Sequence, residues 1–581
     1  MRRLLLFLLL AAALTTGCTP RPGGRIIYGL TLAPTGIDPH INASAELGIP
    51  LTSVYDTLVY QDPKTGEFVP GLAQKWEISE DGRVYTFFLR RGVKFHDGTP
   101  FNAEAVRFNL DRITSPDLAS QKARFMLGPY ERTEVVDEYT VRIVLKEPFA
   151  PLLDSLSQVY LGMASPTAVQ KWGQEYQMHQ VGTGPFIFAE YVPGGHLLLR
   201  RNPDYAWAPS VYQQKTARLE EVEFRFFTDP ATRSPALESG EADVMGEVPP
   251  QDAVRLKDDP RFRIEAVAIP GSSLMFFMNT TRPPLDDLAV RQAILYGTDQ
   301  QAIISAVFRD TSPVACGPLA AVTFGYDPSV CQYYPYDPAR ARALLEERGW
   351  IDSDGDGIRD KNGQPLTLDL YLMSWGYLPT IGELLIAQWT ELGIRVNAQT
   401  VRYPEALKIG REGQHHLMPF QSSGSDPDVL RQFFHSQGSM NWSKVNDPEM
   451  DGWLMEGMRT SDRQQRAAYY SQVQQRVMEQ ALVLPIRDYV NLNGVNQRVQ
   501  GLRFDARGWF PWLINVTLAQ LVGWWLGGDG LRPPPPNSTP KECRIYSASN
   551  YSGFLTLPPP PAAGGEAAGG EVRLNSYSCE T

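Results

Sequence analysis

The sequence predicts an α/β fold, because segments with strand character and segments with helix character are interspersed along it. Segments 222–227 and 366–373 are predicted strands, and segments 289–307 and 338–348 are predicted helices. The chain has 581 residues, of which 43% are apolar and 20% charged, so it is an ordinary globular sequence that is long enough for several domains. We therefore expect a protein of several α/β lobes.

The predicted helix at 338–348 carries signals at both ends. Asp337 is a suitable N-cap, Pro338 occupies the first helical position, and Gly349 follows the last turn. These three residues predict where the helix begins and ends.

The segment 71–112 is the most informative part of the chain. An Asp-Gly turn at 81–82 connects an apolar segment that ends near Ile78 with an alternating strand at 84–90. A second Asp-Gly turn, at 97–98, then redirects the chain. The sequence therefore predicts a hairpin followed by a tight turn.

A helix is predicted directly after the second turn. Asn102 is a suitable cap for it, and Glu104 is favourable in its first turn. Val106, Leu110 and Ile113 have the spacing of one buried stripe. None of these side chains is chemically reactive, so the segment indicates a binding protein and not an enzyme.

The first residues resemble a bacterial lipoprotein signal peptide. Arg2 and Arg3 precede an apolar run at 4–13, and the sequence Leu-Thr-Thr-Gly then leads to Cys18. The run is much shorter than the ~20 residues that span a bilayer, which favours a cleaved export signal over a permanent membrane helix. Cleavage would remove residues 1–17 and leave Cys18 as a lipid-modified first residue, whereas the alternative is an uncleaved membrane anchor. Both put the protein outside the cytoplasm, in the periplasmic space or on the outer face of the cell membrane.

The chain resembles the peptide- and nickel-type solute-binding proteins of family 5, which deliver ligands to ABC importers. The family fingerprint W-x-x-S-x-D-G…Y-T-F-x-L-R-x-G-V-K-F-H-D-G-x-P-F is present from Trp76 to Phe101. Further family segments follow in the family's order at 181–186 (VGTGPF), 200–205 (RRNPDY), 278–284 (MNTTRPP), 290–294 (VRQAI) and 336–350 (YDPARARALLEERGW). Together they cover roughly residues 25 to 525. Ala206 departs from the family pattern, because it stands where an aromatic residue usually follows the Tyr.

The resemblance implies a two-lobed type II periplasmic-binding-protein fold, with a hinge and a ligand cleft between the lobes. The expected parts are a discontinuous first lobe at 25–48, 182–275 and 490–526, an inserted subdomain at 49–181, a second lobe at 276–489 and a C-terminal appendage at 527–581. The appendage is rich in Pro and Gly, which favours an extended or flexible segment.

The resemblance also implies a function. Members of the family close their lobes on a solute, here expected to be a peptide or a related solute, and present the closed form to an ABC import permease. No cofactor is implied, and we expect a monomer. Two alternatives stay open, a sensory or regulatory binding lipoprotein and a binder of an oligosaccharide or metal chelate. Because the sequence has no G-x-S-x-G, H-E-x-x-H or P-loop motif, an exported hydrolase has no positive support.

The resemblance also identifies candidate ligand residues. In dipeptide- and oligopeptide-binding relatives, an Asp shortly before an Asp-Pro step pairs with the ligand's amine, and in dipeptide binders an Arg captures its carboxylate. These positions are Ser423 and Tyr377 here, which disfavours a zwitterionic short peptide unless another charged group substitutes. The residues expected to line the ligand cleft or to substitute are Trp375, Tyr377, Phe420, Ser423, Asp426 and Asp428. Core packing is the alternative role of the three rings.

Four cysteines remain once Cys18 is assigned to lipid. An even number of cysteines outside the cytoplasm favours disulfides. Cys316 and Cys331 bracket one loop, and Cys543 and Cys579 bracket the tail, so local pairing within each couple is the preferred connectivity.

The segment DSDGDGIRD at 352–360 resembles a calcium-binding loop. Its carboxylates at ligand positions 1, 3, 5 and 9 are Asp352, Asp354, Asp356 and Asp360. Position 12, however, is Gly363 and not the bidentate Glu of an EF-hand. A solvated acidic turn is the alternative, because Asp and Gly favour turns for their own reasons.

Charge and histidine spacing bear on the other partner classes. The formal net charge of −11 argues against a nucleic-acid partner. His415 and His416, with His435 further along, suggest a metal or haem ligand cluster, but adjacent side chains diverge on a strand. Ordinary structural histidines are therefore favoured at these positions.

Overall fold

The computed structural model describes residues 24–34, 36–41, 44–120, 122–519, 525–527 and 530–532. The chain divides into two units, Met1–Leu518 and Ala519–Thr581. In the second unit the described residues form an antiparallel pair of short strands, β23 (Trp525–Gly527) and β24 (Gly530–Arg532). The predicted leader, Cys18, Cys543 and Cys579 lie outside the described residues. The fold of the first unit follows.

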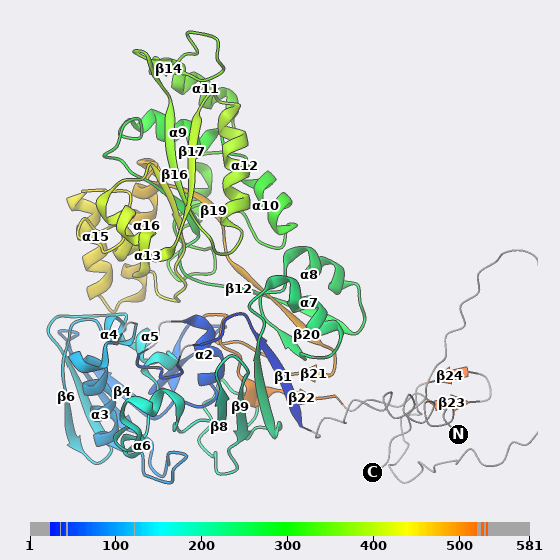
Figure 1. Ribbon diagram of the computed structural model, residues 1–581. Coiled ribbons are helices and arrows are strands. Elements are labelled where there is room, and N and C mark those ends of the chain that lie inside the picture. The colour runs from blue at the N-terminus through cyan, green and yellow to red at the C-terminus, as the bar shows by residue number, and fades with distance from the viewer. Residues whose placement is uncertain are drawn as a thin grey trace, which may run out of the picture. The chain divides into compact units, whose positions relative to one another are not determined.

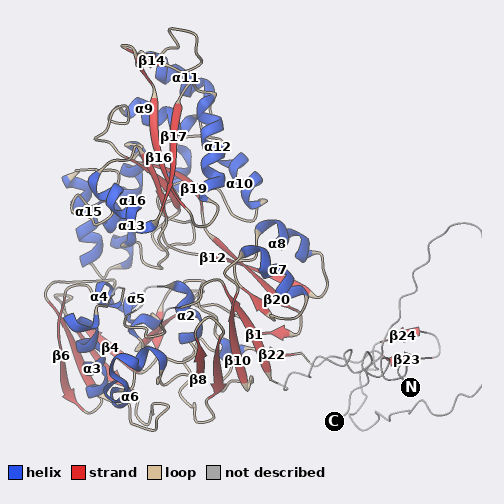
Figure 2. Cartoon of the chain, viewed as in Figure 1, coloured by secondary structure: helices blue, strands red, loops and turns tan. Residues whose placement is uncertain are grey.

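A seven-stranded mixed sheet organises the first lobe (Figures 1 and 2). Its strands, in spatial order, are β12 (Phe262–Ala268), β20 (Val490–Asn496), β11 (Val244–Met245), β1 (Arg25–Leu30), β10 (Glu221–Phe226), β9 (His196–Arg201) and β8 (Phe186–Val192). β1 lies at the centre and is parallel to both of its neighbours, whereas the outer pairs are antiparallel. Because β1 is buried on both faces, its sequence RIIYGL is nearly continuous in apolar residues. One sheet thus combines the start, the middle and the end of the chain.

Two short helices cover part of this sheet. α7 (Pro230–Glu238) and α8 (Pro250–Lys257) each begin with a proline, whose fixed φ suits the first helical position. They bury Leu237 and Leu256 in a small apolar cluster with residues of β11, β12 and β20. This cluster lies beside the strands that lead to the second lobe.

A four-stranded antiparallel sheet forms within the range predicted for the inserted subdomain. Its order is β4 (Ala73–Ile78), β5 (Val84–Leu89), β7 (Thr140–Leu145) and β6 (Tyr130–Asp137). Both predicted Asp-Gly turns have a positive φ at glycine, 67° at Gly82 and 84° at Gly98. The predicted helix is α3 (Ala103–Thr114), where the Asn102 side chain accepts from the backbone N–H of Ala105 at 3.1 Å. The hairpin, the turn and the helix cap are therefore confirmed.

This subdomain shares one hydrophobic core with the first lobe. The buried residues of the apolar cluster run from β1 through α3 and β7 to the segment 499–516. The shorter elements of this region are α2 (Ala45–Leu51), β2 (Val59–Gln61), β3 (Phe68–Pro70), α4 (Ala123–Met126), α5 (Leu152–Leu156), α6 (Pro166–Trp172), β21 (Val499–Gln500) and β22 (Thr517–Leu518). The subdomain is therefore packed on the lobe and is not tethered loosely to it.

A five-stranded sheet with a separate core organises the second lobe. Its strands, in spatial order, are β17 (Arg395–Val401), β16 (Thr367–Met373), β18 (Leu417–Phe420), β13 (Leu274–Met278) and β19 (Val483–Arg487). A separate two-stranded hairpin consists of β14 (Asp360–Lys361) and β15 (Gln364–Pro365). β13 begins two residues before the predicted lobe boundary, and the domain boundaries themselves stay predictions.

Helices surround the second sheet (Figure 2). They are α9 (Leu288–Tyr296), α10 (Gln300–Phe308), α11 (Pro338–Glu347), α12 (Leu378–Thr390), α13 (Tyr403–Glu412), α14 (Val429–Phe434), α15 (Pro448–Arg459) and α16 (Arg463–Glu479). α11 has the predicted ends, since the Asp337 side chain accepts from the backbone N–H of Arg340 at 2.9 Å and Gly349 has a φ of 78°. The single helix predicted at 289–307 is wrong. α9 ends at Tyr296 with Gly297 as its C-cap, and α10 begins at Gln300 after the N-cap Asp299, whose side chain accepts from the backbone N–H of Ala302 at 2.9 Å.

Two chain crossings connect the sheets. One, residues 269–273, leads from β12 to β13, and the other, residues 488–489, leads from β19 to β20. The backbone N–H of Ile269 donates to the carbonyl oxygen of Tyr489 at 2.9 Å, so the crossings lie side by side. We call these two crossings the hinge. In the described part of the chain, no helix combines the length and the apolar content that crossing a membrane requires.

Candidate functional site

The predicted ligand-contacting rings lie at one edge of the second sheet. β16 and β18 run parallel, with Leu370 opposite Leu417, so the segments that follow them start at the same edge. Trp375 and Tyr377 follow β16, and Phe420 is the last residue of β18. The fold therefore brings together two segments that are more than forty residues apart in the sequence.

The three rings differ in accessibility. Trp375 is 38% exposed. Tyr377 is half-buried and meets the Phe308 ring edge-on, with ring centres 5.4 Å apart. Phe420 packs in the core of the second lobe, with its ring centre 5.4 Å from that of Trp442. Trp375 and Tyr377 are thus available to a solute, whereas Phe420 contributes mainly to packing.

Ser423 lies against the hinge. The loop that contains Ser423 forms two backbone hydrogen bonds with the first crossing. The N–H of Ser272 donates to the carbonyl oxygen of Ser422 at 2.8 Å, and the N–H of Gly424 donates to the carbonyl oxygen of Pro270 at 2.9 Å. Opposite Ser423 stands Gly271, with a φ of 134°. A Cβ on Gly271 would meet the Ser422 carbonyl oxygen, so this close approach requires glycine. Ser423 itself is exposed.

Asp426 and Asp428, the predicted charge substitutes, already have partners within the second lobe. Both oxygens of Asp426 accept from Arg466, at 2.8 and 2.9 Å. Asp428 accepts from Arg431 at 2.7 Å and from the Tyr470 hydroxyl at 3.1 Å. Burial raises the pKa of Asp428, and Arg431 acts in the opposite direction. Each carboxylate therefore already has a guanidinium partner within the lobe, and a contact of Asp426 or Asp428 with a ligand amine stays a prediction.

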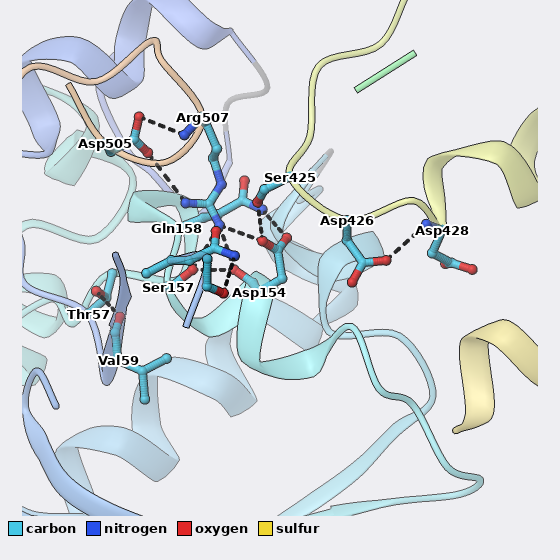
Figure 3. Close-up of polar contacts among 12 residues, drawn as sticks. Thr57, Val59, Asp154, Ser157, Gln158, Ser425, Asp426, Asp428, Asp505 and Arg507 are labelled. Atoms are coloured by element: carbon cyan, nitrogen blue, oxygen red, sulfur yellow. Dashed lines mark hydrogen bonds and ion pairs between the residues drawn. The ribbon is translucent and has the colours of Figure 1, made fainter. Parts of the chain in front are cut away.

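A polar cluster joins the second lobe to the inserted subdomain (Figure 3). Asp154 on α5 accepts from Arg507 at 2.8 Å and from Gln158 at 2.9 Å. Ser425, from the loop that contains Ser423, donates its hydroxyl hydrogen to the same carboxylate. Arg507 also donates to Asp505 at 3.4 Å and to Ser157 at 2.8 Å. The Asp154 carboxylate therefore connects α5 with the loop that contains Ser425 and with the segment that contains Arg507.

A second group of charged and aromatic residues lies at the hinge, and the sequence did not reveal it. We call Arg233, Glu247, Arg487, Tyr489 and Trp509 the hinge-side group. The Tyr489 hydroxyl donates to Glu247, and Arg233 donates to the Glu247 backbone carbonyl at 3.0 Å. The Trp509 ring centre lies 5.5 Å from that of Tyr489, and the indole N–H of Trp509 has no hydrogen-bond partner in the described chain. The only local sequence signal was an arginine that ends the apolar strand VLPIR.

Glu46, near the start of α2, is a buried acid close to this group. Its carboxylate accepts from the backbone N–H of Thr31 at 2.9 Å. Burial and the nearby charge of Glu247 raise the pKa of Glu46 to about 7. The first lobe thus presents a carboxyl group that changes charge near neutral pH.

The acidic turn gathers three of its four predicted carboxylates. Ligand oxygens of Asp352, Asp354 and Asp356 lie within 4.8 Å of one another, and all three residues are exposed. Asp360 instead accepts from the backbone N–H and the hydroxyl of Ser353, at 3.0 and 2.6 Å. Calcium binding stays a prediction.

The adjacent histidines do not form a ligand cluster in the structure. His415 Nε2 lies 2.9 Å from the carbonyl oxygen of Trp442, and His416 Nε2 lies 2.8 Å from that of Pro283. The backbone N–H of Asp369 donates to His416 Nδ1 at 2.9 Å. Because these ring nitrogens bond to backbone groups, both residues have a structural role.

Cys316 and Cys331 form a disulfide, with their Cα atoms 4.6 Å apart. The loop that it closes contacts both hinge crossings. The Ser273 hydroxyl donates to the Gly317 carbonyl at 2.6 Å, and the Ala321 N–H donates to Asp488 at 2.8 Å. The disulfide therefore constrains a loop that holds the hinge.

Comparison with known proteins places this geometry in a family. The family model described as bacterial extracellular solute-binding proteins, family 5, matches residues 67–443. Di/tripeptide-binding protein 1 of Pseudomonas aeruginosa is 28% identical over 86% of this chain and 95% of the relative, and heme-binding protein A of Haemophilus influenzae is 29% identical over 82% and 89%. The crystal structure of NikA from Brucella suis in complex with Fe(III)-EDTA superposes with a TM-score of 0.76 at 26% identity, over 85% of this chain and all of that one.

Proposed function

This chain belongs to the bacterial extracellular solute-binding proteins of family 5, and on that premise we propose that it captures a peptide or a related solute between its lobes and delivers it to an ABC import permease. The observation that carries this proposal is the hinge. Within the described residues, two sheets with separate cores are joined by only two crossings, and charged and aromatic side chains from both lobes meet beside them. Such a connection permits the lobes to close on a ligand at small cost in packing.

The peptide class is supported by the relatives. Several that match most of this chain are named as di/tripeptide- or dipeptide-binding proteins. The exposed Trp375 and the half-buried Tyr377 supply apolar contact for side chains, while the hinge-side group supplies charge. A site that combines apolar walls with a few placed polar groups is typical of small-solute recognition.

We propose that Cys18 carries the membrane anchor. The proposal rests on the leader sequence, in which a short apolar run precedes Leu-Thr-Thr-Gly-Cys. Replacement of Cys18 by Ala should release the protein from the membrane fraction and abolish labelling by a fatty-acid analogue. Labelling that persists in this variant would contradict the anchor.

The function is tested with protein that lacks the first 18 residues. Libraries of di-, tri- and pentapeptides, a set of oligosaccharides, haemin and Fe(III)-EDTA are each added, and retention is measured by native mass spectrometry and by the rise in Tm. A peptide present at 100 times its Kd should stabilise the protein by about 2.7 kcal/mol. Retention of only a sugar or a chelate would contradict the peptide class and favour the corresponding alternative.

Delivery to a permease is tested separately in cells. A strain that lacks this protein should lose uptake of the retained peptide, and the restored gene should recover it. Normal uptake together with a lost transcriptional response would instead identify a sensory lipoprotein.

A further inference from the structure

Arg487 is a buried cation at the junction of the lobes. It is the last residue of β19, directly before the second hinge crossing, and it is 9% exposed. The guanidinium carbon lies 4.0 Å from the centre of the Phe308 ring and 4.3 Å from that of Tyr489. Two aromatic rings thus hold this side chain in one position.

Within the described part of the chain, Arg487 has no carboxylate at ion-pair distance. Its Nη1 donates to the Ser312 hydroxyl at 3.2 Å, and its Nε has no hydrogen-bond partner. Glu247 attracts it electrostatically from farther away, but that carboxylate already accepts from Tyr489. Asp488, the next residue, is turned toward the backbone N–H of Ala321 at 2.8 Å. The charge of Arg487 is therefore left largely uncompensated.

Other buried arginines in this protein show how such a charge is normally satisfied. Arg466 and Arg507 each have a carboxylate at 2.8 Å, from Asp426 and Asp154. Arg291 donates instead to backbone carbonyls, including that of Gln480 at 2.8 Å. Because an unpaired buried charge is costly, the exception at Arg487 indicates a partner that arrives from outside the chain.

The surroundings of Arg487 point to the ligand. Arg487 lies over the face of Phe308, and Tyr377 meets the same ring edge-on. Tyr377 and Tyr489 are both partly exposed, so the rings beside Arg487 reach the surface. Dipeptide-binding relatives are expected to have an Arg at the position of Tyr377. In this chain Arg487, at the end of β19, places a cation against the same Phe308 ring that Tyr377 contacts.

We propose that Arg487 is the carboxylate anchor of the solute site, and that the solutes of this protein carry a carboxylate such as the C-terminus of a peptide. The proposal rests on the proposed function and specifies its ligand. Arginine suits this role, because its planar donors bind both oxygens of a carboxylate at once. Phe308 and Tyr489 fix the guanidinium before the ligand arrives, which reduces the ordering cost of binding.

The test compares two probes that differ only in the proposed contact. They are an equimolar tripeptide library with free C-termini and the same library with C-terminal amides. Binding is measured by titration calorimetry and native mass spectrometry on protein without its first 18 residues. The variants are Arg487→Gln, Arg487→Lys and, as a matched control, Arg402→Gln, which changes an exposed arginine of the second lobe.

The wild-type protein should bind the free acids about 10- to 100-fold more tightly than the amides. Arg487→Gln should abolish this preference by weakening the acids alone, Arg487→Lys should keep part of it, and Arg402→Gln should keep all of it. Equal binding of acids and amides by the wild type would overturn the anchor and leave the proposed function intact. Binding of neither library would overturn both.

A stability measurement separates an anchor from a structural arginine. Arg487→Met retains an apolar side chain between the two rings and removes the charge together with the long hydrogen bond to Ser312. The ligand-free Tm of this variant should equal or exceed that of the wild type, because relief of the buried charge offsets the lost contacts with Ser312 and the rings. A markedly lower ligand-free Tm, with acid preference retained, would show that Arg487 serves packing alone.

Discussion

Ser425 in the second lobe donates its hydroxyl hydrogen to Asp154 in the inserted subdomain, and this bond links the two sides of the molecule across the lobe junction. Arg507 holds the same carboxylate from the first lobe at 2.8 Å. The bond between Ser425 and Asp154 therefore connects the second lobe to the inserted subdomain beside the hinge.

The first prediction concerns this bond. If the bond between Ser425 and Asp154 supports the ligand-bound arrangement of the lobes, Ser425→Ala should weaken binding of a retained peptide by about 10-fold, because a hydrogen bond to a charged group is lost. The loss should appear mainly as faster dissociation in stopped-flow measurements. Ser422→Ala is the matched control, since the contacts of Ser422 with the hinge use its backbone N–H and carbonyl. Equal dissociation rates in the two variants would contradict the role of Ser425.

The second prediction concerns Asp426. Arg466→Gln should destabilise the second lobe by about 3 to 5 kcal/mol, because it leaves the Asp426 carboxylate without its guanidinium partner. Denaturant unfolding of the variant measures this loss. Adding Asp426→Asn should recover much of the stability, and the folded double variant should bind peptide with wild-type affinity. Weaker peptide binding by the folded double variant would indicate that Asp426 contacts the ligand.

The third prediction concerns pH. The pKa of Glu46 is raised from an ordinary value of 4.5 to about 7, so between these values the folded protein holds a proton that the unfolded chain has lost. The contribution of Glu46 to stability is therefore most favourable below pH 4.5 and decreases as pH rises to 7, by up to about 1.4 kcal/mol per unit. Glu46→Gln should be more stable than the wild type at pH 7 to 8.

Thermal and denaturant unfolding from pH 4.5 to 8 check this effect. The difference in free energy of unfolding between Glu46→Gln and the wild type should grow with pH across the window. Glu77→Gln, at an exposed position, should show no such trend. A constant difference for Glu46→Gln would mean that this carboxyl titrates at its ordinary pKa.

The fourth prediction concerns the disulfide. Replacing Cys316 and Cys331 by Ala should lower stability by about 3 kcal/mol, since the bond closes a loop with a sequence separation of 15. Denaturant unfolding measures this change, and treatment of the wild type with a reductant should reproduce it. Because the loop contacts both hinge crossings, peptide affinity should also fall. Unchanged stability after reduction would contradict a constraining role.

Local sequence signals predicted local structure well. Asn102 and Asp337 cap the helices that they were expected to cap, because each contact spans only three residues. The one predicted helix at 289–307 was wrong because the apolar spacing continues through Gly297, although Asp299 is itself a cap signal. Helix boundaries of this kind depend on packing as well as on spacing.

The partners of the site residues could not be predicted in the same way. Asp426 meets Arg466 forty positions later, and Arg487 meets Phe308 from a different part of the lobe. Such pairs depend on strand order, which composition and spacing do not determine. The resemblance proposed Trp375 and Tyr377 at one edge of the second sheet as ligand residues, which stays a prediction, and it gave no indication that Arg487 from another strand contacts the same Phe308 ring as Tyr377.

The most direct test of the account is to identify the molecule that the protein carries in its own host. The protein is purified without denaturation, its mass is measured by native mass spectrometry, and the released small molecule is sequenced or identified. The account predicts a bound peptide or related solute with a free carboxylate, and loss of that molecule from Arg487→Gln. A stoichiometric sugar or other solute without a carboxylate would contradict it.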